Sequence, residues 1–137
     1  MNQRVLFVDD EPNVLDAIQR TLRKQVELRT ASSGADALRI MSEAGPFALV
    51  VSDMRMPAMN GSQFLARVRE LQPDTVRIIL SGEADLEDTI AAVNEGRIYR
   101  FLTKPCPSDR LLAAIEDGLN QHRLLTAEKA LYCLVRK

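Results

Sequence analysis

Five polar residues that could carry out chemistry stand at the ends of four short apolar runs. They are, in chain order, Asp9, Asp10, Asp53, Ser81 and Lys104. Clustered carboxylates repel one another unless a cation neutralises them, and oxygen ligands without His or Cys suit a hard ion such as Mg²⁺. A lysine and a hydroxyl could balance the oxygens of a phosphoryl group, which a carboxylate could itself accept. If the fold gathers these residues, they indicate phosphoryl transfer onto the protein.

Each of these residues alone has a plain structural explanation. Acidic residues often cap a following helix, and a Lys-Pro pair such as Lys104-Pro105 is common in turns. The chemical interpretation therefore depends on whether the surrounding elements bring all of them to one place.

The apolar runs predict five strands. Residues 5–8 and 48–51 show no polar alternation, which is typical of parallel strands covered on both faces, and residues 76–80 are similarly short and β-branched. Residues 27–31 and 99–103 alternate, which suits the two edges of a sheet. With helical patterns between the strands, we predict an α/β fold with a doubly wound, five-stranded parallel sheet of flavodoxin-like order 2-1-3-4-5. The site would form at the carboxyl ends of the strands.

Five helices are predicted between and after these strands from apolar residues at helical spacing. Pro12 stands near the start of the first helix, and Ser33 followed by Asp36 predicts a capping box at the second. Pro73 should end the third helix and Gly96 the fourth.

The last predicted helix, capped by Ser108, is longer than the sheet needs, because no Pro or Gly interrupts residues 120–137. A second apolar stripe, shifted in phase from the one facing the sheet, consists of Leu124, Ala127, Leu131 and Leu134. We therefore predict one domain over residues 1–122 and a helical extension or linker over residues 123–137. The extension turns back, frays or packs on a partner, including a second copy. His122 is predicted to be an exposed residue of this helix.

The composition excludes several classes of protein. Of 137 residues, 18 are Lys or Arg and 19 are Asp or Glu, so a net charge of −1 removes the electrostatic case for direct nucleic-acid binding or a polybasic membrane surface. No apolar run approaches the roughly 20 residues of a membrane span, and the start lacks the pattern of a signal peptide. Cys106 and Cys133 are too few for a disulfide framework or a zinc site. We predict a soluble protein of a reducing compartment.

Four motifs in this order resemble the response regulator receiver (CheY-like) domain of two-component signalling. They are Asp9-Asp10-Glu11-Pro12, residues 52–61 (SDMRMPAMNG), Ser81-Gly82 and Lys104-Pro105. The resemblance covers residues 3–122. It implies that Asp53 accepts a phosphoryl group from a phosphohistidine on a sensor histidine kinase. It also implies that Asp10, Asp53 and the backbone carbonyl of Arg55 bind Mg²⁺, or Mn²⁺ in its place, while Asp9 helps, often through water.

The same resemblance assigns the remaining site residues. Lys104 would pair with the phosphoryl oxygens, Ser81 would hydrogen-bond them as its loop moves inward, and Phe101 occupies the position of the switch aromatic. Arg55 and Glu83 would flank the phosphoryl group, and we expect them to pair across the mouth of the site. The position after Lys104-Pro105 is often aromatic in the family, whereas here it is Cys106, which leaves a smaller apolar contact.

The implied function is a bacterial, cytoplasmic phosphorylation switch that regulates an output domain or partner protein, and not an enzyme. Residues 94–105 are similar to receivers joined to HD-GYP cyclic-di-GMP phosphodiesterase outputs. Two alternatives stay open. An aspartyl phosphatase of the haloacid dehalogenase type would need an Asp where Arg55 stands, and a receiver-like interaction module would never be phosphorylated. The last two helices or the extension could also form a homodimer.

Overall fold

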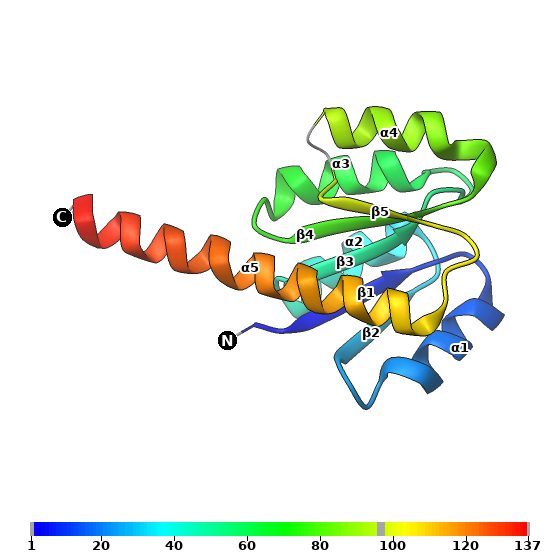
Figure 1. Ribbon diagram of the computed structural model, residues 1–137, viewed down its shortest axis with the longest axis horizontal. Helices are drawn as coiled ribbons and strands as arrows, with labels where there is room; N and C mark the ends of the chain where they lie inside the picture. The colour runs from blue at the N-terminus through cyan, green and yellow to red at the C-terminus, as the bar shows by residue number, and fades with distance from the viewer. Residues whose placement is uncertain (1, 96–97, 137) are drawn as a thin grey trace.

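Five parallel strands form a single sheet at the centre of the computed structural model, which describes residues 2–95 and 98–136. The strands are β1 (Arg4–Val8), β2 (Glu27–Ala31), β3 (Leu49–Asp53), β4 (Val76–Ser81) and β5 (Arg100–Thr103). Their order is β2-β1-β3-β4-β5, so β2 and β5 are the edges (Figure 1). The predicted topology and edge strands are therefore confirmed.

Helices cover both faces of the sheet, which makes three layers (Figure 1). The helices are α1 (Pro12–Leu22), α2 (Gly34–Ala44), α3 (Gly61–Leu71), a short 3₁₀ turn η1 (Glu83–Asp85), α4 (Leu86–Asn94) and α5 (Ser108–Arg136). Alternate residues of β1 serve the two faces: Leu6 packs in the core that contains Phe64 of α3, whereas Phe7 packs in the core that contains Ile115 of α5. All four side chains are fully buried. This two-sided burial explains why β1 and β3 show no polar alternation.

The helix boundaries follow local chemistry. Pro12 is the first residue of α1, where its missing N–H is harmless. Ser33 caps α2 by accepting a hydrogen bond from the Asp36 N–H at 3.0 Å, but no reciprocal bond completes the predicted capping box. The complete box lies instead at α3, between Asn60 and Gln63. The predicted stop at Gly96 lies outside the described residues.

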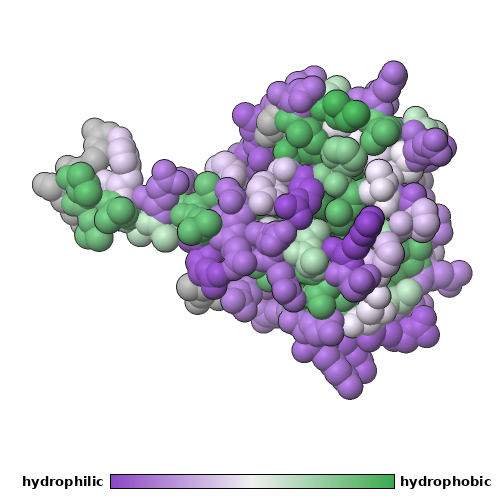
Figure 2. All heavy atoms as spheres, viewed as in Figure 1, coloured by the Kyte–Doolittle hydropathy of each residue, from purple (hydrophilic) through white to green (hydrophobic). Residues whose placement is uncertain are grey.

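The last helix, α5, is continuous over 29 residues and projects well beyond the sheet (Figure 1). Its second apolar stripe is open to solvent, with Leu124, Leu131 and Leu134 between 63 and 69 % exposed. Figure 2 shows apolar surface on this projecting end. Within residues 2–95 and 98–136, no helix is both long and apolar enough to cross a membrane.

One loop anchors the middle of α5 to the body of the protein. The His122 ring donates through Nδ1 to the backbone carbonyl of Asp74, at 2.9 Å, and Lys129 Nζ lies 2.8 Å from an Asp74 carboxylate oxygen. His122 is only 8 % exposed, so its predicted exposure is wrong. The reason is tertiary: the loop between α3 and β4 folds over the helix at this point.

Replacing His122 with Ala should loosen α5 beyond the sheet, because the buried hydrogen bond to Asp74 is lost. We expect the free energy of unfolding to fall by about 1 kcal/mol, measured by urea denaturation. Amide hydrogen exchange should accelerate over residues 119–130 and stay unchanged in β1 and β3. Asn120→Ala, at an exposed position of the same helix, is the control. Equal exchange in both variants would show that His122 does not anchor the helix.

Candidate functional site

The carboxyl ends of β1, β3, β4 and β5 meet at one edge of the sheet. The register pairs Val8 with Ser52, Asp53 with Leu80, and Ser81 with Thr103, so the residues that end these strands are neighbours. Asp9 and Asp10 follow β1 directly. Parallel pairing therefore brings together polar residues that are up to 95 positions apart in the chain, from Asp9 to Lys104.

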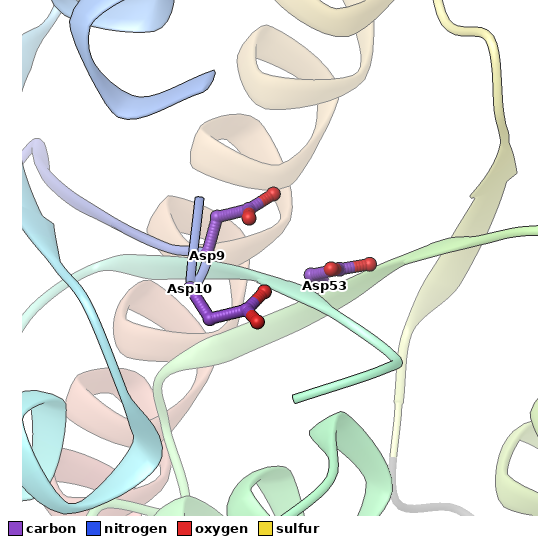
Figure 3. Close-up of side chains that lie close together, drawn as sticks. All are labelled: Asp9, Asp10 and Asp53. Atoms are coloured by element: carbon purple, nitrogen blue, oxygen red, sulfur yellow. The ribbon is translucent and has the colours of Figure 1, made fainter. Parts of the chain in front are cut away.

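Three carboxylates form the centre of this edge (Figure 3). Ligand oxygens of Asp9, Asp10 and Asp53 all lie within 4.8 Å of one another. Asp9 and Asp53 are 1 and 4 % exposed, while Asp10 is the most exposed of the three. Figure 3 shows Asp9 and Asp10 at the end of β1, with their carboxylates directed toward the side on which Asp53 lies. Such a set of hard oxygen donors fits Mg²⁺ and does not fit a thiolate- or imidazole-bound metal.

The surroundings oppose the negative charge on Asp9. Burial raises the pKa of the Asp9 carboxyl, and the charges of Asp53 and Asp10 raise it further. The backbone N–H of Glu11, which donates to Asp9 Oδ1 at 2.9 Å, and the charge of Lys104 act in the opposite direction. The net rise in the pKa of Asp9 comes first from burial, and the neighbouring carboxylates add to it. A cation bound at this position would offset both effects.

Lys104 supplies the positive charge of the site. Its Nζ lies 2.7 Å from Asp53 Oδ1. Burial by itself lowers the pKa of Lys104, but the hydrogen bond and charge of Asp53, with the charges of Asp9 and Glu11, raise it above its ordinary value. The amine is therefore held in its charged form, 60 % covered by the protein and able to balance additional anionic oxygens.

The loop after Asp53 is packed tightly beneath it. Gly61 donates its N–H to the Met54 carbonyl at 2.8 Å, and a Cβ at Gly61 would lie 2.3 Å from the carbonyl oxygen of Asp53. Only glycine allows this approach of α3 to the end of β3. Met54 and Met56 of this loop are buried, and Met59 packs against the same core.

Ser81 is fully buried, and its hydroxyl is directed to its own loop and to α4. It donates to the Gly82 carbonyl at 3.0 Å and lies 2.9 Å from the hydroxyl of Thr89, which is also fully buried. Thr89 did not emerge from the sequence as a site residue. The sequence feature that could have identified Thr89 is a hydroxyl on the apolar face of α4, three residues after Leu86. Phe101 is partly buried and packs against the core under α2, α3 and α4.

Arg55 forms an ion pair across the mouth of the site, but not with the expected residue. Its Nη2 lies 3.1 Å from Asp85 Oδ1, so the predicted pair with Glu83 is wrong. The 3₁₀ turn η1 at Glu83–Asp85 places the third residue of the turn, and not the first, opposite Arg55. The Arg55 side chain is 74 % exposed, which keeps the contribution of this pair to stability small.

An apolar cavity of about 510 Å³ adjoins Lys104 between α1 and α5. Its wall includes Val14 and Ile18 of α1, Leu111 of α5, and Cys106. This matches the smaller apolar contact expected at Cys106. The polar edge thus continues into an apolar recess on the α1 and α5 side of the sheet.

Comparison with known proteins gives one consistent result. Residues 5–116 match the family model of the response regulator receiver domain. The hydrogenase transcriptional regulatory protein HoxA of Cupriavidus necator is 41 % identical over 120 residues, which are 88 % of this chain and 25 % of HoxA. The chain therefore spans about a quarter of the length of such curated relatives.

Two solved structures extend the comparison. The structure described as adenylate cyclase from Rhodopirellula baltica is 38 % identical with a TM-score of 0.94, and the match covers 96 % of this chain and 98 % of that chain. The signal receiver domain of an HD domain-containing protein from Pseudomonas fluorescens Pf-5 is 33 % identical with a TM-score of 0.82, covering 90 % and 98 %.

Replacing Asp9 with Asn should stabilise the metal-free protein at neutral pH. The folded protein binds the Asp9 proton more tightly than the unfolded chain, so Asp9 lowers the free energy of unfolding as pH rises above its ordinary pKa of 3.8. Asn keeps an oxygen for the Glu11 N–H and removes the charge. We expect the unfolding temperature at pH 7 to rise on the order of a few degrees, with the gain shrinking as pH falls toward 4.

Calorimetry with and without Mg²⁺ measures this effect. Mg²⁺ should raise the unfolding temperature of the wild type more than that of Asp9→Asn. The control is Asp16→Asn, which removes the same charge from an exposed position of α1. Equal shifts for Asp9→Asn and Asp16→Asn would contradict a strained carboxylate cluster.

Proposed function

The chain belongs to the response regulator receiver domain family, and on that premise we propose that Asp53 accepts a phosphoryl group from a histidine kinase. Receiver domains are phosphoacceptor switches and not enzymes with a defined reaction, and response regulators pair with histidine kinases and carry output domains. The observation that carries the proposal is the buried Asp53 carboxylate, paired with Lys104 at 2.7 Å beside two further carboxylates.

The proposed reaction is a displacement at phosphorus. An Asp53 carboxylate oxygen attacks the phosphorus of a phosphohistidine, the phosphorus–nitrogen bond breaks, and the imidazole leaves with the electron pair. Lys104, which neutralises Asp53 before transfer, would then pair with the phosphoryl oxygens. Asp9, Asp10, Asp53 and the backbone carbonyl of Arg55 would hold Mg²⁺, or Mn²⁺ in its place. The ion would supply charge neutralisation for the phosphoryl oxygens.

The apolar recess between α1 and α5 supports a kinase-docking surface beside Asp53. It opens next to Lys104 and includes apolar side chains from both helices. An apolar side chain of the kinase could enter it while the phosphohistidine approaches the carboxylates. The wall residue Cys106 leaves the space that an aromatic side chain would fill.

The proposed output is a change in the α4, β5 and α5 side of the domain. Ser81 would turn toward the phosphoryl group, and the half-buried Phe101 would turn inward, which couples the site to β5. We also propose residues 1–122 as the receiver unit and residues 123–137 as the connection to an output. An HD-GYP-type output is supported by the HD domain-containing protein whose receiver resembles this chain. A cytoplasmic location stays a prediction.

The α5 extension would pair with the same helix of a second copy. Leu124 and Leu131, and likewise Ala127 and Leu134, are seven residues apart, which is the spacing of a parallel coiled coil. In that register Arg123 and Glu128 flank the apolar stripe, so Arg123 of one helix would face Glu128 of the other. His122, Leu125 and Lys129 lie on the other side of the helix, toward its own domain.

Incubation with acetyl phosphate and Mg²⁺ should add a single phosphoryl group to the wild type and none to Asp53→Asn, which keeps the size of the side chain. Intact-mass spectrometry measures both, with EDTA as the metal-free control. A wild type that binds Mg²⁺ but stays unmodified, even by a phosphorylated kinase, would overturn the phosphoacceptor proposal. It would favour the unphosphorylated interaction module instead.

Self-association of the wild type should increase with concentration and be abolished by Leu131→Glu, because the charge would be buried between the two helices. Sedimentation equilibrium measures the mass, which should approach twice that of the monomer in the wild type. Cys133→Glu adds the same charge to the same helix away from the stripe and should leave association unchanged. A monomeric wild type at high concentration would reject this helix pair.

A further inference from the structure

The hydroxyl of Ser81 is already engaged before any phosphoryl group is present. It donates to the Gly82 carbonyl at 3.0 Å and lies 2.9 Å from Thr89 Oγ1 on α4. Both side chains are fully buried, so the contact between the two hydroxyls is shielded from water. Lys104 donates its backbone N–H to the Ser81 backbone carbonyl, but across the part of the chain that the structure describes no hydrogen bond joins the Ser81 hydroxyl to Asp53 or Lys104. Ser81 is thus held toward α4 and not toward the phosphoacceptor.

Proton counting shows why this contact matters. A hydroxyl has one proton to donate, and a phosphoryl oxygen can only accept. To bind the phosphoryl group, the Ser81 hydroxyl must stop donating to the Gly82 carbonyl, turn away from Thr89 and donate to a phosphoryl oxygen instead. The contact with Thr89 therefore favours the unphosphorylated orientation of Ser81.

Thr89 has a second acceptor that makes this release feasible. Its hydroxyl also lies 3.0 Å from the backbone carbonyl of Asp85, one turn earlier on the chain. When Ser81 leaves, Thr89 can donate to Asp85, so no buried hydroxyl loses its last partner. Thr89 can thus exchange one acceptor for the other without exposure to water.

The second acceptor is itself tied to the phosphoacceptor loop. The side chain of Asp85 pairs with Arg55, two residues after Asp53, at 3.1 Å. A continuous set of contacts therefore runs from the loop after β3, through Asp85 and Thr89, to Ser81 at the end of β4.

We propose that Thr89 is a positioning residue for phosphoryl transfer, which holds Ser81 away from Asp53 until phosphorylation and then transfers its hydrogen bond to the Asp85 carbonyl. This inference rests on the proposed function, because it requires Ser81 to bind the phosphoryl group. It concerns the orientation of Ser81 and assigns Thr89 no contact with the reacting atoms.

Thr89→Val tests the inference, because Val keeps the branched shape and removes the hydroxyl. With acetyl phosphate and Mg²⁺, the rate constant for adduct formation should increase about threefold, which corresponds to the loss of one neutral hydrogen bond that favours the unphosphorylated state. Thr89→Ser restores a hydroxyl and should return the rate toward that of the wild type. The dissociation constant for Mg²⁺ should be the same in all three proteins.

A double-mutant cycle separates positioning from a general effect on structure. In a Ser81→Ala background, Thr89→Val should have no further effect on the rate, since the residue through which Thr89 acts is gone. A persistent threefold increase in that background would overturn the inference. So would a wild-type rate in Thr89→Val, or a Thr89→Ser variant that behaves like Thr89→Val.

The outcome for the wild type distinguishes the two proposals. If the wild type forms the Asp53 adduct and Thr89→Val matches its rate, only the role of Thr89 is rejected. If the wild type forms no adduct, the proposed function fails, and the role of Thr89 fails with it. Thermal unfolding of each variant confirms that a changed rate does not come from a changed amount of folded protein.

Discussion

Repulsion among three carboxylates is the constraint on which the rest of the site depends. Parallel pairing of β1 with β3 places Asp9, Asp10 and Asp53 with oxygens within 4.8 Å of one another, and two of these side chains are buried. Lys104 and the Glu11 N–H oppose this charge without removing the rise in the pKa of Asp9. A raised pKa means that the charged form of Asp9 is less favourable in the folded protein than in the unfolded chain. Such a cluster of oxygen donors could hold a hard cation such as Mg²⁺.

The site is connected to the rest of the domain through the strands that form it. Ser81 ends β4 and leads through η1 into α4, while Lys104 follows β5 and leads into α5. A change at Ser81 therefore acts on the start of α4, and a change at Lys104 acts on the start of α5 on the opposite face of the sheet. At its other end, β4 follows the loop whose Asp74 contacts both His122 and Lys129 of α5. The long helix is thus held to the domain at the point where it leaves the sheet.

Side-chain partners were harder to predict than the elements that carry them. The pair of Arg55 with Asp85 depends on a three-residue 3₁₀ turn, and a shift of two positions along that turn changes the partner. His122 lies in a polar stretch of sequence and is buried only because a loop 48 positions earlier folds over it. Thr89 shows no distinctive motif, and its contact with Ser81 arises from the way α4 packs back onto the end of β4.

The sequence by itself determined the strands, their order and the edge at which the polar residues meet. Two-sided burial removes polar alternation from central strands, and the carboxyl ends of parallel strands lie together, so Asp9, Asp10, Asp53, Ser81 and Lys104 were predictable as neighbours. Only the tertiary structure decided which atoms pair within that neighbourhood. Hydrogen bonds and ion pairs form over about 3 Å, whereas periodicity locates a residue only to a face or an end of an element. The turns and loops decide which atoms come within that distance, and their conformations depend on packing between segments that are distant in the sequence.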